Sequence, residues 1–171
     1  MVRPPAPAET RKTMEATKEN KARERYWAMK DRQQKEVNAF PMFAAFSDEQ
    51  LEEGKKKLGV TENRELCHVG ASCFIRKADK ASFLAMLARL DRERDEAMKD
   101  EAFAVDAFAY ELANHEYCIT MDPTDALSVF GYTLKSKPDA EGWAVPDWVA
   151  TFGGNEMLAR AFKAAMRKAR H

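Results

Sequence analysis

Hydrophobic positions along this chain are sparse at the N-terminus and dense from Phe40 onward. Residues 1–8 contain three prolines, a composition that favours disorder over regular structure. Residues 9–38 contain neither Gly nor Pro and are rich in Ala, Glu, Lys, Arg and Gln, which predicts a long helix. Because its apolar side chains form no continuous stripe, we expect an extended helical arm that docks only near residues 26–29.

Two short apolar runs predict strands of one small sheet. Residues 40–46 form an aromatic run, in which Pro41 favours an edge position, and residues 72–77 form a second strand that we expect to pair with it. Between them, Ser47 and Gln50 have the spacing of a capping box and predict a helix that Gly59 ends. Residues 60–69 fit neither pattern.

The strongest helical pattern lies in the middle of the chain. Asp79 is expected to cap a helix that extends to about residue 99. Residues 103–113 are apolar over most of a helical surface, as is typical of a helix at the centre of a core. We therefore predict that residues 103–113 form the core helix.

The remaining third of the chain alternates between short apolar runs and turn residues. Residues 117–120 resemble a third strand, and residues 122–125 a helix start whose helix ends at Gly131. Residues 135–142 are polar and contain Pro138, which indicates a linker. Asn155 follows an apolar cluster and is expected to cap a last helix with an inward apolar face.

Together these patterns predict an α+β fold that is predominantly helical. We expect a small antiparallel sheet of two or three strands, packed by five to seven helices. The expected division is a charged N-terminal arm over residues 1–38, a core over residues 39–134, and a linker with a C-terminal helical segment over residues 135–171.

Length and composition fit one soluble domain with a tail. The chain has 171 residues, of which 45% are hydrophobic, and these suffice for a core. Its longest apolar run is much shorter than the roughly 20 residues that span a bilayer, and its first residues do not resemble a secretory signal. Three cysteines without such a signal indicate free thiols and a reducing, cytoplasmic location.

Charge is segregated, although the formal net charge is zero. Residues 1–38 hold ten basic and six acidic residues, residues 100–134 seven acidic and no basic ones, and the last seventeen residues five basic and one acidic. Such signed faces steer encounters with charged partners. The candidate partner-binding residues are an acidic belt (Asp100, Glu101, Asp106, Glu111, Glu116, Asp122, Asp125) and a basic arm and tail (Arg11, Lys12, Lys21, Arg23, Arg25, Arg160, Lys163, Arg167, Lys168).

One cluster of polar residues is the best candidate for chemistry. Glu111 and His115 are four residues apart, so that a helix places them on one face, where they can hold a metal or orient an imidazole. The alternative, which we favour, is that Asn114 and His115 cap the core helix. Cys67 and His68 add possible zinc ligands, but the chain lacks a Cys-x2-Cys pair. We therefore expect no cofactor.

Three segments carry a family resemblance: residues 43–54 (FAAFSDEQLEEG), residues 70–77 (GASCFIRK) and residues 111–120 (ELANHEYCIT). In these segments the chain resembles small uncharacterised proteins encoded by bacteriophages, plasmids and integrative elements, over roughly residues 40–134. Those relatives are richer in glycine where this chain has Ala71 and Cys73. The resemblance implies an accessory role in a mobile element, and such proteins often act against host defence systems.

We accordingly expect a non-enzymatic protein that binds a host macromolecule and inhibits a defence system in the manner of an anti-CRISPR protein. The partner would be a host protein or ribonucleoprotein, for which the acidic belt could imitate a nucleic-acid backbone. One alternative is a nucleic-acid-binding protein that uses the basic arm and tail, and another is a metal-dependent hydrolase at Glu111 and His115. The chain lacks P-loop, dinucleotide and His-Glu-x-x-His motifs. No membrane partner is expected, and a homodimer stays open.

Overall fold

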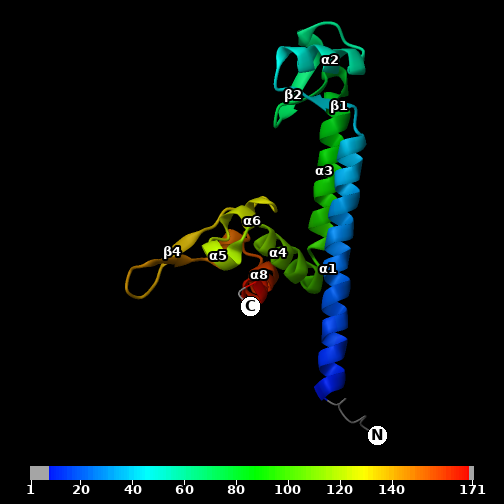
Figure 1. Ribbon diagram of the computed structural model, residues 1–171. Coiled ribbons are helices and arrows are strands. Elements are labelled where there is room, and N and C mark those ends of the chain that lie inside the picture. Colours follow the sequence, from blue (N-terminus) through cyan, green and yellow to red (C-terminus); the bar gives the residue numbers. More distant parts are fainter. Residues whose placement is uncertain (1–7, 170–171) are drawn as a thin grey trace. The chain divides into compact units, whose positions relative to one another are not determined.

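A computed structural model describes the backbone of residues 8–169 and the side chains of residues 24–169 (Figure 1). This part of the chain holds eight α-helices and two antiparallel sheets, which confirms the predominantly helical α+β class. The helices are α1 (Ala8–Ala39), α2 (Asp48–Leu58), α3 (Lys80–Ala97), α4 (Glu101–Asn114), α5 (Tyr117–Thr120), α6 (Thr124–Ser128), α7 (Trp148–Thr151) and α8 (Glu156–Ala169). The strands are β1 (Met42–Ala44), β2 (Leu66–Gly70), β3 (Cys73–Arg76), β4 (Ser136–Pro138) and β5 (Ala144–Pro146), and the 3-10 turns are η1 (Asn63–Glu65) and η2 (Lys77–Asp79).

The chain divides into two compact units. The first contains Met1–Ala28 and Glu96–His171, and the second contains Met29–Asp95. The expected arm over residues 1–38 therefore contributes to both units, and the C-terminal segment lies in the same unit as the core helix. The expected division of the chain into parts that end at residues 38 and 134 stays a prediction.

The second unit holds a three-stranded sheet in the order β1-β3-β2. As predicted, β1 pairs with β3, and Phe43 lies opposite Phe74. The first strand is shorter than the apolar run, because α1 continues to Ala39 and the cap of α2 begins at Ser47. Residues 60–69, which fitted neither pattern, supply η1 and the edge strand β2.

Local signals in the second unit set the ends of α2. The Ser47 hydroxyl accepts a hydrogen bond from the Gln50 backbone N–H at 3.3 Å, and the Gln50 side chain accepts one from the Phe46 N–H at 2.7 Å. Gly59 ends the helix in the left-handed conformation, with φ of 69°. The predicted cap and stop are therefore confirmed.

The helices α1 and α3 run antiparallel within the second unit. Gln33 donates a hydrogen bond to the Leu90 carbonyl at 3.1 Å, and further along the pair the rings of Phe40 and Phe83 lie 5.0 Å apart. The predicted helix after Asp79 begins at Lys80, behind the η2 turn, and the Asp79 carboxylate pairs with Arg76.

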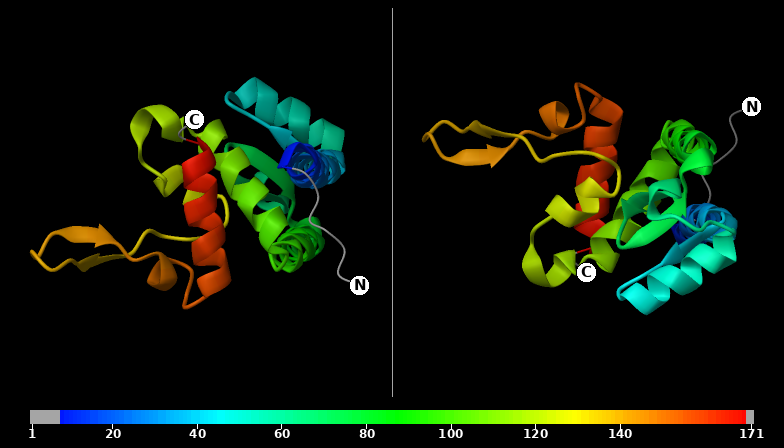
Figure 2. Two further views of the ribbon diagram at one scale, coloured as in Figure 1. Left: turned by 90° about the horizontal axis from the view of Figure 1, so that it is seen from below. Right: turned by 90° about the horizontal axis from the view of Figure 1, so that it is seen from above.

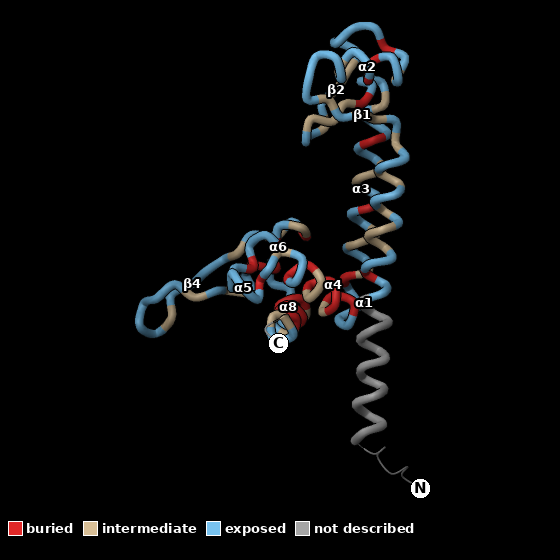
Figure 3. The backbone as a smooth tube through the Cα atoms, viewed as in Figure 1, coloured by how far each residue is buried: buried red, intermediate tan, exposed pale blue. Residues whose placement is uncertain are grey.

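The first unit is built around α4, which confirms the predicted core helix. Phe108 and Leu112 are fully buried, and α8 packs along α4 through its inward face (Figure 2). Phe108 contacts the rings of Phe130, Phe152 and Phe162 at centroid distances of 5.0, 5.4 and 5.0 Å. The Asn155 side chain caps α8 by accepting from the Leu158 N–H at 3.0 Å, as predicted. Buried positions accordingly concentrate on α4 and α8 in this unit (Figure 3).

Two predictions about the last third of the chain are wrong. Residues 117–120 form the single-turn helix α5 instead of a strand, because Glu116 and Met121 on either side adopt left-handed backbone conformations that isolate one helical turn. The expected linker of residues 135–142 instead supplies β4, which pairs with β5 in a hairpin. Within residues 8–169, no helix is long and apolar enough to cross a bilayer.

Candidate functional site

Glu111, the centre of the predicted polar cluster, is buried in the first unit. Its side chain has no exposed surface, and its Oε1 accepts a hydrogen bond of 2.5 Å from the Tyr26 hydroxyl. Its Oε2 lies 3.8 Å from His115 Nε2, one helical turn further along α4. The carboxylate therefore ties α1 to α4 and lies beside the imidazole, but no open surface reaches it.

His115 lies at the C-cap position of α4, where the capping interpretation places it. The helix α4 ends at Asn114, and the backbone N–H of the C-cap residue His115 donates to the Glu111 carbonyl at 3.0 Å. The next residue, Glu116, turns into the left-handed region with φ of 54°, which ends the helix. These residues therefore end one helix and begin the next.

The predicted metal ligands are divided between the two units. Glu111 and His115 belong to the first unit, whereas Cys67 and His68 lie on β2 in the second. The His68 ring packs against Phe74 in a tilted arrangement, with a centroid distance of 5.2 Å. Among the residues that the structure describes, no three His, Cys, Asp or Glu side chains are grouped so that they could hold a metal ion. Within the described residues, the hydrolase hypothesis therefore has no group of three ligands behind it.

Part of the predicted acidic belt is neutralised by cations of the basic arm and tail. Three ion pairs, all within the first unit, join an acid of the predicted acidic belt to a cation of the predicted basic arm and tail. They are Arg25 with Asp100 at 3.3 Å, Arg160 with Glu101 at 3.5 Å, and Lys168 with Asp106 at 3.3 Å. Lys163 and Arg167 are exposed. Arg11, Lys12, Lys21 and Arg23 lie outside the residues whose side chains are described.

The other members of the belt, Glu116, Asp122 and Asp125, are exposed. Asp122 accepts hydrogen bonds from the Thr124 hydroxyl at 2.6 Å and from the Thr124 N–H at 2.9 Å. These two bonds favour the charged form and lower the pKa of the Asp122 carboxyl below its ordinary value. A carboxylate is therefore fixed at this surface.

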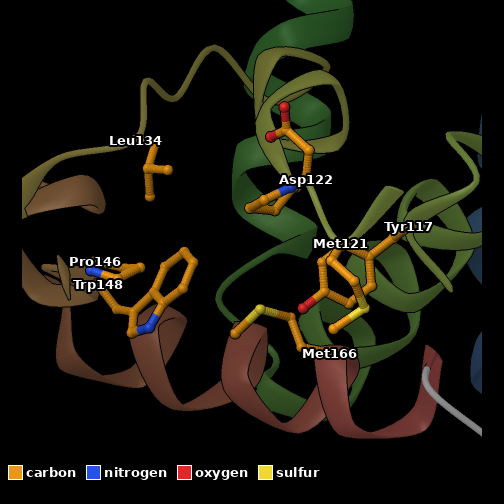
Figure 4. A pocket seen from close by; sticks show the side chains of 8 residues that line it. Tyr117, Met121, Asp122, Leu134, Pro146, Trp148 and Met166 are labelled. Carbon is orange, nitrogen blue, oxygen red and sulfur yellow. The ribbon is translucent and has the colours of Figure 1, made fainter. Parts of the chain in front are cut away.

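Asp122 lies at the edge of an open apolar cavity, which we call the Trp148 groove (Figure 4). The cavity has a volume of about 520 Å³ and lies entirely within the first unit. In Figure 4, Trp148 and Tyr117 lie on opposite sides of it, with Met166 below and Asp122 above. The lining residues are Tyr117, Met121, Asp122, Pro123, Leu134, Pro146, Trp148 and Met166.

Short elements hold the two sides of the groove in place. Met121 follows α5 with φ of 56°, and half of its surface is exposed. On the other side, the Asp147 carboxylate accepts from the Ala150 N–H at 3.1 Å and so starts α7, which carries Trp148. The Trp148 ring packs on Phe162 of α8 with a centroid distance of 5.1 Å. The indole is therefore anchored on one side and faces the cavity on the other.

Several large apolar side chains of the first unit are exposed. Ile119 and Met121 flank one side of the groove in sequence, Val149 follows Trp148, and Trp143 lies in the β4–β5 hairpin. Their exposed fractions are 76%, 50%, 40% and 73% respectively. Of these four, Met121 lines the cavity, and exposed apolar surface of this kind is typical of a protein-binding surface. Among the residues of the groove, only Asp122 was predicted from the sequence to be a site residue, as a member of the acidic belt. The apolar residues within 143–152 were the other signal in the sequence that could have located the groove.

Comparison with known protein families gives a match over most of the chain. The chain belongs to the family of unknown function DUF7659, whose model matches residues 25–142. Five lining residues, Tyr117, Met121, Asp122, Pro123 and Leu134, lie inside the matched region, whereas Pro146, Trp148 and Met166 follow it. Neither the curated proteins nor the solved structures include a match to this chain. Part of the groove therefore lies beyond the residues that match the family.

Proposed function

We propose that this protein acts by binding another protein and not by catalysis. The observation that carries the proposal is the Trp148 groove, an open apolar cavity in a small unit that also exposes Ile119, Met121 and Trp143. An open apolar cavity at the surface, with exposed apolar side chains elsewhere on the same unit, is typical of a protein that a partner covers. The polar cluster offers less support for chemistry, because Glu111 is buried and bound to Tyr26.

The groove favours a partner segment that combines an apolar side chain with a cation. Met121 and Met166 are unbranched and polarizable, so they adapt to an aliphatic or aromatic side chain between Trp148 and Leu134. The ionised carboxylate of Asp122 at the edge attracts a Lys or Arg beside that side chain. The exposed acids Glu116 and Asp125 extend this preference.

The resemblance of residues 43–54, 70–77 and 111–120 to mobile-element proteins suggests the biological setting. We propose that the partner is a component of a host defence complex, such as a CRISPR effector, and that binding inhibits it. This version places the contact at the groove. Imitation of nucleic acid by the whole acidic belt has less support, because Asp100, Glu101 and Asp106 already pair with cations of the same unit.

The test compares three forms of the full-length protein in bacteria with active CRISPR immunity. They are the wild type, Met121→Glu, which places a second carboxylate at the groove, and Leu84→Glu. Leu84 is a matched control, because it is 52% exposed and lies in the second unit. We measure phage plaquing, and we measure capture of the purified effector complex at physiological salt.

The proposal predicts that wild type and Leu84→Glu restore plaquing and capture the effector, whereas Met121→Glu loses both effects. Equal plaquing with and without the wild-type protein would overturn the defence role. Equal capture by wild type and Met121→Glu would overturn the assignment of the groove as the binding surface.

A further inference from the structure

Trp143 is presented on a rigid support. It lies at the end of the β4–β5 hairpin and is 73% exposed, an unusual position for a large aromatic residue. The Asp139 carboxylate accepts hydrogen bonds from the backbone N–H groups of Glu141 and Trp143, at 3.1 and 2.8 Å. The Asp139 N–H in turn donates to the Trp143 carbonyl at 2.9 Å. The turn is therefore ordered before any partner arrives, which lowers the entropic cost of binding.

The same chain cannot insert Trp143 into its own groove. Pro146 lines the groove, and the extended residues of β5 separate it from Trp143 by about 10 Å, at roughly 3.3 Å per residue. The hairpin extends away from α5 and α8 (Figure 1). Folding the tip back would break the pairing of Lys137 with Val145 and of Pro138 with Ala144. Each copy therefore offers both an exposed indole and an open apolar cavity that only another molecule can fill.

We propose that two copies of this chain associate by exchanging these features, so that Trp143 of each copy occupies the Trp148 groove of the other. A twofold arrangement makes both contacts at once, because each surface meets its counterpart on the second copy. The self-association regulates the groove: a copy whose groove is filled cannot bind the partner there. Only this competition rests on the proposed function.

The area available indicates a weak dimer. A tryptophan side chain buries about 150–250 Å², so two insertions bury about 300–500 Å² of indole surface and cover about as much groove surface. The sum, about 600–1,000 Å², falls below the roughly 1,200–2,000 Å² of stable complexes. Contacts by the neighbouring exposed Ile119 and Val149 add to it. The contact also lacks the cation that suits Asp122, because the exposed charged residue beside Trp143 in the turn is the acidic Glu141. We therefore expect reversible dimers that a partner can displace.

Sedimentation equilibrium of the full-length protein over a wide concentration range tests the association. Wild type is expected to shift from monomer to dimer as its concentration rises. Trp143→Ala is expected to weaken the dimer at least about 30-fold, as a central aromatic residue does in an interface. Trp27→Ala is the matched control, because Trp27 is 54% exposed but lies on α1, and it is expected to leave the dimer unchanged.

Mixing two defective variants gives the sharpest result. Trp143→Ala keeps an intact groove and Met121→Glu keeps an intact Trp143, so each alone is expected to stay monomeric at concentrations where wild type dimerises. One productive contact forms when they are mixed, and differently labelled copies are expected to associate measurably. Asp139→Ala, which frees the turn, is expected to weaken the wild-type dimer several-fold, whereas Asp139→Asn keeps an acceptor and restores it.

Three outcomes would overturn the proposal: a wild type that remains monomeric at every concentration, a dimer that Trp143→Ala leaves intact, or variants that fail to associate on mixing. Circular dichroism of each variant establishes that it is folded, so a loss of association is attributable to the contact. The proposed function fails independently of the dimer if the wild-type protein dimerises but does not capture the effector. A monomeric wild type that captures the effector overturns the dimer alone.

Discussion

Gly54 offers a direct test of how the second unit is packed. It lies inside α2, where an alanine ordinarily stabilises a helix by about 1 kcal/mol relative to glycine. A Cβ added at Gly54, however, would lie 2.0 Å from Cδ2 and 2.4 Å from Cγ of Phe43. Since Cγ joins the ring to the backbone side of the residue, the whole ring must move and not only its outer edge.

The structure indicates that the clash outweighs the gain in helix propensity. Phe43 is held in register opposite Phe74 by the pairing of β1 with β3, and the two rings stack with centroids 5.6 Å apart. Forcing a methyl group into such a contact costs about 1–3 kcal/mol. Because this overlap is severe, the upper part of that range applies. We expect Gly54→Ala to lower the free energy of unfolding by about 1–2 kcal/mol.

Urea unfolding followed by circular dichroism measures this change, and hydrogen exchange of the α2 amides locates it. The control places Gly54→Ala in a Phe43→Leu background, in which the ring is gone and the alanine is expected to be neutral or stabilising. A stabilising effect of Gly54→Ala in the wild type would refute the reasoning, because it would show that Phe43 does not lie against this face of α2.

Three further predictions concern single side chains. Tyr26→Phe removes the hydrogen bond to the buried Glu111 carboxylate and is expected to lower the free energy of urea unfolding by about 1.5–3 kcal/mol. Asp100 caps α4, and bonds from the Phe103 and Ala102 N–H groups, with Arg25, lower its pKa; its stabilisation is therefore present at neutral pH and lost as the carboxyl protonates in acid. Asp100→Ala should cost about 1 kcal/mol at pH 7, and urea titrations toward about pH 2 should show the difference from wild type closing. Ala71 adopts a left-handed conformation with φ of 46° in the β2–β3 turn, which glycine adopts without strain. Ala71→Gly is therefore expected to raise the free energy of unfolding by up to about 1 kcal/mol, which a higher melting temperature would show.

Features that depend on a few neighbouring residues could be predicted from the sequence alone. The cap at Ser47, the stop at Gly59 and the cap at Asn155 lie where their side chains or backbone freedom predicted, because these bonds close within one turn of chain. The central position of α4 followed from apolar residues on nearly every side, which only burial can accommodate. The capping role of His115 followed from the same local reasoning.

Tertiary structure decided the features that join distant segments. β2 and the β4–β5 hairpin have weak local sequence patterns. They form because β2 pairs with β3 and β4 pairs with β5, and neither pairing could be predicted from the sequence. The predicted charged faces were partly removed because Arg25, Arg160 and Lys168 meet acids far away in sequence. The Trp148 groove arises in the same way. Its walls come from separate elements. The periodicity of apolar residues along the chain does not predict which of them remain exposed once the core has formed.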